Sequence, residues 1–107
     1  MTKCFFNATL VLSDQLLSEG WLLVEDQKIA RYGTGESIAA DEMIDCGGQY
    51  LSPGFIDVHC HGGGGGSFGK LELEEHVKAM KMYLSHGVTA MTPTAATDKA
   101  EEMKIFR

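Results

Sequence analysis

Residues 51–62 constrain the fold of this chain more than any other segment, because they join a turn, a strand and a glycine run. Pro53 and Gly54, near the start of the segment, break the preceding structure and predict a turn. Residues 55–60 are mostly apolar, which is typical of a strand covered on both faces. Side chains alternate along a strand, so Asp57, His59 and His61 are expected to share one face.

Two imidazoles at positions i and i+2 can hold one cation when the strand places them side by side. A bare His-x-His is more often a pair of surface histidines. At His59 and His61, the apolar strand before the pair and the glycines after it favour a metal site.

The first half of the chain reads as short strands separated by turns. Apolar and polar residues alternate over 6–13, as in a half-buried strand. Residues 21–24 and 28–32 flank a polar tip and predict a hairpin, and 43–46 form a further strand. Residues 1–52 are therefore predicted to form a small β-domain, either a sandwich or a sheet.

The second half alternates strand and helix. An apolar stripe at Leu73, Val77, Met80 and Leu84 predicts a helix after the glycine run. Gly87 suits the position just past its end, and residues 88–93 read as a second strand. A capping box from Asp98 to Glu101 predicts the start of another helix.

The order strand, helix, strand builds a parallel sheet by a right-handed crossover. The chain is thus predicted to be α/β, with a β-sandwich-type domain over 1–52 and the first βαβ unit of a barrel over 53–107. A closed β/α barrel takes about 250 residues, so the 107 residues are expected to be the front of something longer. Apolar surface on the unclosed sheet would then invite association, and a homodimer is expected.

Composition excludes several classes of partner. A net charge of −6 argues against nucleic acids and anionic membranes, since no basic patch is available to meet phosphates. The longest apolar run, 21–24, is far too short to span a membrane, and no signal peptide is recognisable. Three cysteines without metal-finger spacing indicate free thiols and a cytoplasmic location.

Residues 51–62 resemble the first barrel strand of the amidohydrolase superfamily, whose members carry a metal-dependent (β/α)8 barrel. The hairpin around residues 25–27 is similar to that superfamily's small N-terminal β-domain. The glycine run 62–66 and the strand 87–94, with its Thr-Pro-Thr element, are similar to the family of N-acetylglucosamine-6-phosphate deacetylases. The resemblance covers nearly the whole chain.

This resemblance implies a hydrolase that converts N-acetylglucosamine 6-phosphate, a phosphorylated amino sugar, into glucosamine 6-phosphate and acetate. It implies that His59 and His61 are ligands of a divalent metal, with zinc first and iron, manganese or cobalt as alternatives. The remaining ligands and the general acid/base aspartate of the family match no residue of 1–107, so the chain alone is expected to be inactive. His76 and His86 match no ligand position and are expected to be surface or capping residues.

Asp57 and the glycine run at the end of the strand can each be interpreted in two ways. Asp57 either orients a ligand or is a structural carboxylate bonded to the backbone. The glycine run that follows is either a flexible linker or a loop that approaches the substrate closely. Because the run joins a strand to a helix, the second interpretation is favoured, with Gly62, Gly63 and Gly64 as the candidates.

Other functions compete with this one. Gly64, Gly69 and Lys70 satisfy the spacing of a phosphate-binding loop, but Leu71 stands where a magnesium-binding Ser or Thr is needed. A cyclic amidase or a deaminase of the same superfamily would share the His-x-His strand.

Overall fold

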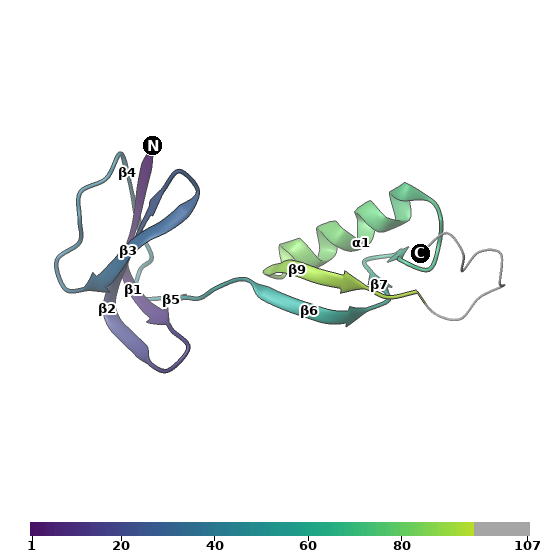
Figure 1. Cartoon of the computed structure of the whole chain (residues 1–107), viewed down its shortest axis with the longest axis horizontal. Coiled ribbons are helices and arrows are strands. Elements are labelled where there is room, and N and C mark those ends of the chain that lie inside the picture. Colours follow the sequence, from purple (N-terminus) through teal and green to yellow (C-terminus); the bar gives the residue numbers. More distant parts are fainter. Residues whose placement is uncertain (96–107) are drawn as a thin grey trace. The chain divides into compact units, whose positions relative to one another are not determined.

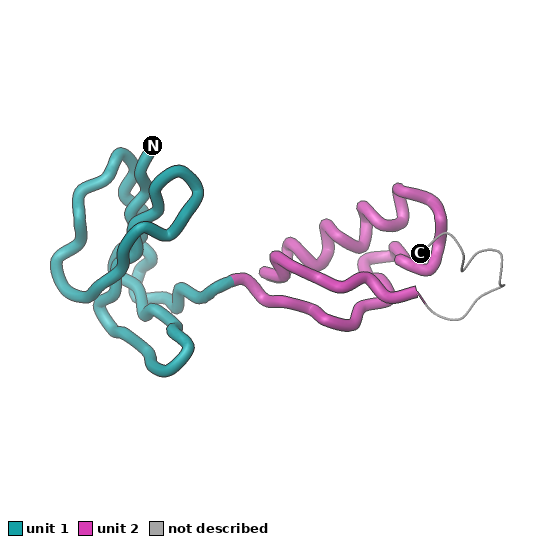
Figure 2. Tube along the Cα trace, in the orientation of Figure 1, with its two compact units in different colours: residues 1–53 teal, residues 54–107 magenta. Residues whose placement is uncertain are grey.

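The computed structural model describes residues 1–95, so the helix start predicted at Asp98 lies outside the described residues. The chain divides into two compact units, Met1–Pro53 and a second one that begins at Gly54 (Figure 2). The division falls one residue after the predicted domain boundary.

The first unit is one five-stranded sheet (Figure 1). Its strands are β1 (Thr2–Val11), β2 (Leu16–Glu25), β3 (Lys28–Thr34), β4 (Glu42–Asp45) and β5 (Tyr50–Leu51). The order is β3-β2-β1-β4, with β5 also on β1; β1 pairs antiparallel with β2 and parallel with β4 and β5. The predicted hairpin is confirmed as β2 and β3, and Asp26 and Gln27 at its tip have φ of 45° and 67°, as a two-residue hairpin turn requires.

A β-bulge interrupts the alternation predicted for the first strand. Asn7 has φ of 53°, and the pairing with β2 shifts register around it. Phe6, before the bulge, packs with Cys4 in one cluster, whereas Leu10, after it, lines an apolar groove with Phe5. Uninterrupted alternation would put Leu10 on the side of Cys4, so that part of the sequence prediction is wrong: the extra residue of the bulge reverses the faces.

The second unit contains the strand–helix–strand order predicted from the sequence. Its elements are β6 (Phe55–Cys60), β7 (Gly62–Gly63), β8 (Gly66–Ser67), α1 (Leu73–Ser85) and β9 (Val88–Pro93). β6 and β9 pair in parallel, and α1 connects them (Figure 1). A small core of Cys60, Phe68 and Ala79 lies between strand, hairpin and helix, and Gly87 ends the helix with φ of 85°.

Much apolar surface of this unit is exposed. Ile56 and Val58 on β6 are 70% and 74% exposed. The predicted stripe on α1 is not its buried face: Leu73 and Leu84 are exposed, and Ala79 is the buried helix residue. Val77, Met80 and Leu84 of the stripe instead line an apolar groove of about 490 Å³ together with β9. Two parallel strands and one helix cannot cover both faces of such a sheet.

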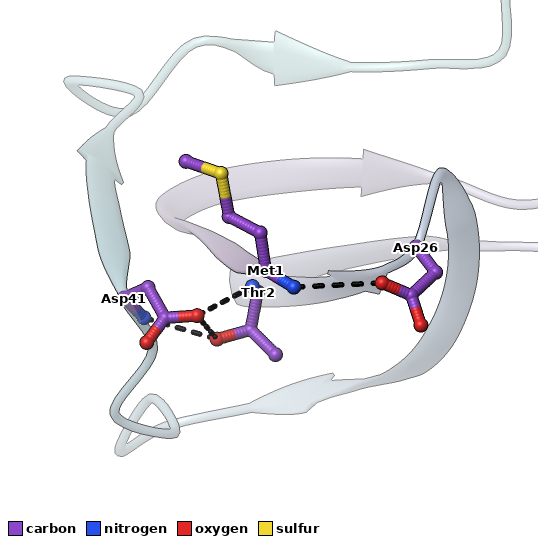
Figure 3. A network of polar contacts seen from close by, with 4 residues as sticks. All are labelled: Met1, Thr2, Asp26 and Asp41. Atoms are coloured by element: carbon purple, nitrogen blue, oxygen red, sulfur yellow. Dashed lines mark hydrogen bonds and ion pairs between the residues drawn. The ribbon is translucent and has the colours of Figure 1, made fainter.

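The N-terminus of the first unit is held by carboxylates (Figure 3). The amide and hydroxyl of Thr2 donate to the Asp41 carboxylate at 2.7 and 3.0 Å, and the Met1 ammonium lies 3.4 Å from Asp26. The backbone and side-chain bonds from Thr2 lower the pKa of Asp41. Bonds from the Gly47 amide and then the Asn7 side chain lower the pKa of Asp45.

We expect the first unit to lose stability as pH falls below about 4, the ordinary value for an aspartate. A carboxylate with a lowered pKa stabilises the fold above its unfolded value, and this contribution is lost as pH falls through the folded value. The double replacement Asp41→Asn and Asp45→Asn should therefore reduce the fall of the melting temperature with pH below about 4. Trp21 fluorescence would follow the melting. A variant as acid-sensitive as the parent would contradict this assignment, and Asp14→Asn, at an exposed aspartate of the same unit, is the control.

Candidate metal centre

Two histidines lie together at the carboxyl end of β6. His59 is in the strand and His61 is the first residue after it. Both side chains are exposed, and their Nε2 atoms are 3.0 Å apart, with the ring planes tilted by 56°. The predicted pairing of these residues on one face is therefore present in the structure.

The separation of the two nitrogens suits a shared cation. Imidazole nitrogens bind zinc at about 2.0–2.1 Å, and two such bonds at about 90–109° put the nitrogens about 2.9–3.4 Å apart. The same 3.0 Å also suits a hydrogen bond in which one ring donates its proton to the other. Within residues 1–95, no group of three or more His, Cys, Asp or Glu side chains is arranged to hold a metal, so the candidate site described consists of two histidines.

Asp57 bonds to the backbone of the pair. Its Oδ1 accepts the amide hydrogen of His59 at 3.0 Å, two residues along the strand. A carboxylate bonded to the backbone is the structural role considered for Asp57 above. The bond holds the backbone of His59 in place. An orienting bond to either ring remains a prediction.

Three further contacts hold the chain around His61. The carbonyl of Cys60 accepts the amide of Thr94 at 2.8 Å, and the carbonyl of His61 accepts the amide of Phe68 at 2.9 Å. The hydroxyl of Tyr83, on α1, donates to the carbonyl of Gly62 at 3.0 Å. Sequence reasoning did not identify these residues, because backbone contacts over such separations leave no local pattern.

The glycines after the pair form a tight hairpin rather than an open loop. Gly64 and Gly65, between β7 and β8, have φ of 59° and 83°, the values of a type I′ turn. A methyl group on Gly66 would overlap the backbone of α1 at Glu75 and Ala79. The close approach observed for this run is therefore to the helix. Contact of residues 62–64 with a substrate remains a prediction.

This hairpin does not have the form of a phosphate-binding loop. In that motif the loop leads directly into a helix whose first amides face the phosphate. Here β8 ends before Lys70, α1 begins only at Leu73, and the Lys70 ammonium is 3.6 Å from the carboxylate of Glu75.

The other two histidines contact backbone carbonyls near the two ends of α1. His76 Nε2 is 2.6 Å from the carbonyl of Lys70, and its ring meets the edge of Phe68. His86 Nδ1 is 2.9 Å from the carbonyl of Met82 at the helix end. Neither joins the pair, as expected for surface or capping residues.

Burial affects the titration of groups behind the site. Burial, followed by the charge of Asp57, raises the pKa of the Cys60 thiol. Burial also raises the pKa of Tyr83, with smaller contributions from Cys60 and Asp57. Both groups therefore keep their protons at neutral pH.

Among residues 1–95, no helix is long and apolar enough to cross a membrane.

Comparisons with known proteins find N-acetylglucosamine-6-phosphate deacetylases and, over a shorter stretch, dihydroorotases. The chain is 37% identical to mouse N-acetylglucosamine-6-phosphate deacetylase over 104 residues and 35% identical to the human protein over 105. These alignments cover 94% and 91% of the chain, but it spans about a quarter of the length of either relative. A dihydroorotase from Lactobacillus helveticus is 37% identical over 73 residues, which is 68% of the chain. No family model matches.

Solved structures give the same grouping. The N-acetylglucosamine-6-phosphate deacetylase of Pasteurella multocida superposes with a TM-score of 0.87 at 28% identity, over 97% of this chain and 28% of that one. A mutant of the Mycobacterium smegmatis deacetylase, in complex with N-acetyl-D-glucosamine-6-phosphate, superposes with a TM-score of 0.78 at 28% identity, over 96% of this chain and 26% of that one.

Proposed function

We propose that this chain, a homologue of the N-terminal portion of N-acetylglucosamine-6-phosphate deacetylases, supplies the first two metal ligands of such an enzyme. The reaction would hydrolyse the acetamide of N-acetylglucosamine 6-phosphate to acetate and glucosamine 6-phosphate. The observation that carries the proposal is the convergence of the His59 and His61 Nε2 atoms at 3.0 Å. The likeness to the deacetylases over nearly the whole chain supports it.

The residues present fit a divalent cation. Imidazole nitrogens are common ligands of zinc, which we propose as the metal, with iron, manganese and cobalt as alternatives. When bound, such a cation polarises an amide carbonyl and lowers the pKa of water to about 7. The chain's own part is to hold two imidazole nitrogens at the spacing a cation needs, on a strand end fixed by the Asp57 and Thr94 contacts.

The described residues supply only part of such a site. A catalytic zinc takes three protein ligands, and residues 1–95 bring two together. We therefore propose that residues 1–107 alone do not catalyse deacetylation. The substrate is proposed to be a phosphorylated amino sugar because a homologous structure holds one. The predicted homodimer and cytoplasmic location stay predictions.

A cyclic amidase is the second candidate, since the match to a dihydroorotase includes two thirds of the chain. Both reactions hydrolyse an amide, so the His pair does not separate them. The deacetylase is favoured because its alignment extends over 94% of the chain.

A chimera tests the choice of substrate. The chain would replace the corresponding N-terminal quarter of the mouse deacetylase, and acetate release from N-acetylglucosamine 6-phosphate would be measured with zinc present. We expect activity that is lost with His59→Asn or His61→Asn and retained with His86→Asn. A folded chimera that hydrolyses dihydroorotate and not the amino sugar would contradict the deacetylase assignment.

A further inference from the structure

We propose that Tyr83 is a positioning residue for the metal pair, whose hydroxyl orients His61 through the carbonyl of Gly62. This inference rests on the proposed function, because it assigns Tyr83 a part in cation binding. It concerns a residue on α1 that is far from the pair in the sequence and carries no recognisable motif.

The backbone at His61 needs an external tether. β6 ends at Cys60 and β7 begins at Gly62, so His61 lies in the gap between two strands. Gly62 has φ of 141°, in the region that side chains rarely adopt, and a glycine loses more freedom on ordering than any other residue. Local sterics therefore do not determine how the peptide after His61 is oriented.

Tyr83 supplies that tether from the helix. Its hydroxyl donates to the Gly62 carbonyl at 3.0 Å, across 21 residues of sequence. The amide of Phe68 donates to the carbonyl of His61 at 2.9 Å, so two successive carbonyls are held. The Phe68 bond holds the peptide that follows His61 and the Tyr83 bond holds the next one, so a change of backbone direction at His61 would act against these two contacts.

The tyrosine is itself held in place. Its ring stacks on Phe68, with centroids 6.4 Å apart, and packs against the core that contains Cys60 and Ala79. Burial raises the pKa of this phenol, so it remains a donor at neutral pH. The donor is therefore preorganised on a rigid element, which is what a supporting contact to a metal ligand requires.

The two histidines have different supports. The amide of His59 is bonded to Asp57 within the strand, whereas the Tyr83 hydroxyl is bonded to the chain just after His61. Loss of the Tyr83 hydroxyl should therefore affect His61 and leave His59 in place. This difference separates a positioning role from a general contribution to stability.

The test is a calorimetric titration of the 107-residue chain with zinc, and with nickel as a redox-inert second probe. Tyr83→Phe, which keeps the ring, is expected to weaken cation affinity about tenfold, since outer contacts of metal ligands typically contribute 10–100-fold. Tyr32→Phe, at an exposed tyrosine in the other unit, is the matched control and should leave affinity unchanged. Tyr83→Met, which fills the space without a hydroxyl, should give the same loss.

A double-mutant cycle with His61→Asn completes the design. Once His61 is absent, Tyr83→Phe should have no further effect on affinity. Equal affinity of the parent and Tyr83→Phe, or an equal loss with and without His61, would overturn the role of Tyr83 and leave the metal pair intact. A parent chain that binds neither cation would overturn the metal proposal together with this one.

Discussion

Gly66→Ala is expected to destabilise the second unit by about 3 kcal/mol, at the upper end of what overpacking costs. The methyl group would overlap the Glu75 carbonyl oxygen and the Ala79 amide nitrogen, both of which belong to the backbone of α1. A side chain can rotate away from such a clash, but a helix backbone cannot move without breaking its own hydrogen bonds. The hairpin would therefore have to leave the helix.

Gly69 offers a matched control in the same segment. A methyl group there would meet only the Ser67 hydroxyl oxygen at 3.5 Å, an ordinary contact. Gly69→Ala should be neutral or stabilise by about 0.5 kcal/mol, because it restricts the unfolded chain. Gly65→Ala, with open space but φ of 83°, should fall between the two.

Chemical denaturation followed by far-ultraviolet circular dichroism measures this difference, because α1 lies in the second unit. Fluorescence of Trp21, which lies in the first unit, should be unaffected by all three variants. Equal unfolding free energies for Gly66→Ala and Gly69→Ala would contradict the packing of this hairpin on the helix.

The glycine run shows how far sequence reasoning reaches. Five consecutive glycines between a strand and a helix predict that the backbone approaches something closely. The sequence does not say what is approached, because that depends on where α1 returns over the hairpin. In the structure Gly64 and Gly66 meet the helix, so packing against α1 accounts for part of the run without a ligand.

The side-by-side placement of the two histidines was the most predictable part of the candidate site. Alternation along a short strand is enough to place His59 and His61 on one face, and their Nε2 atoms do converge. The same alternation failed in the first strand, where Asn7 adopts a positive φ and reverses the faces. A bulge is decided by pairing with neighbouring strands, so a pattern within one strand does not reveal it.

For the helix, the sequence pattern identified the element but not its buried face. The stripe at Val77, Met80 and Leu84 correctly predicted a helix from its periodicity, without identifying what the stripe contacts. Within the described residues it lines an open groove, whereas Ala79 faces the core. Small residues carry little weight in such patterns, yet only a small one lets the hairpin approach the helix at Gly66.

Replacing either metal ligand is expected to have the largest effect on cation binding. Two linked binding groups can exceed either alone by a factor of 10²–10⁴, so His59→Asn or His61→Asn should weaken zinc affinity by about 100-fold. Asparagine retains polarity and approximate size. Because both imidazoles are exposed, the fold should remain stable.

The matched control is His86→Asn, a third exposed histidine outside the pair. Titration of zinc at neutral pH, with unfolding measured in parallel, separates lost ligands from lost structure. The two single variants and the double variant should bind equally weakly, because the first removal already destroys the chelate. If instead each replacement weakened affinity only slightly, or His86→Asn weakened it as much, the 3.0 Å approach of the two rings would be a hydrogen bond between imidazoles and not a metal centre.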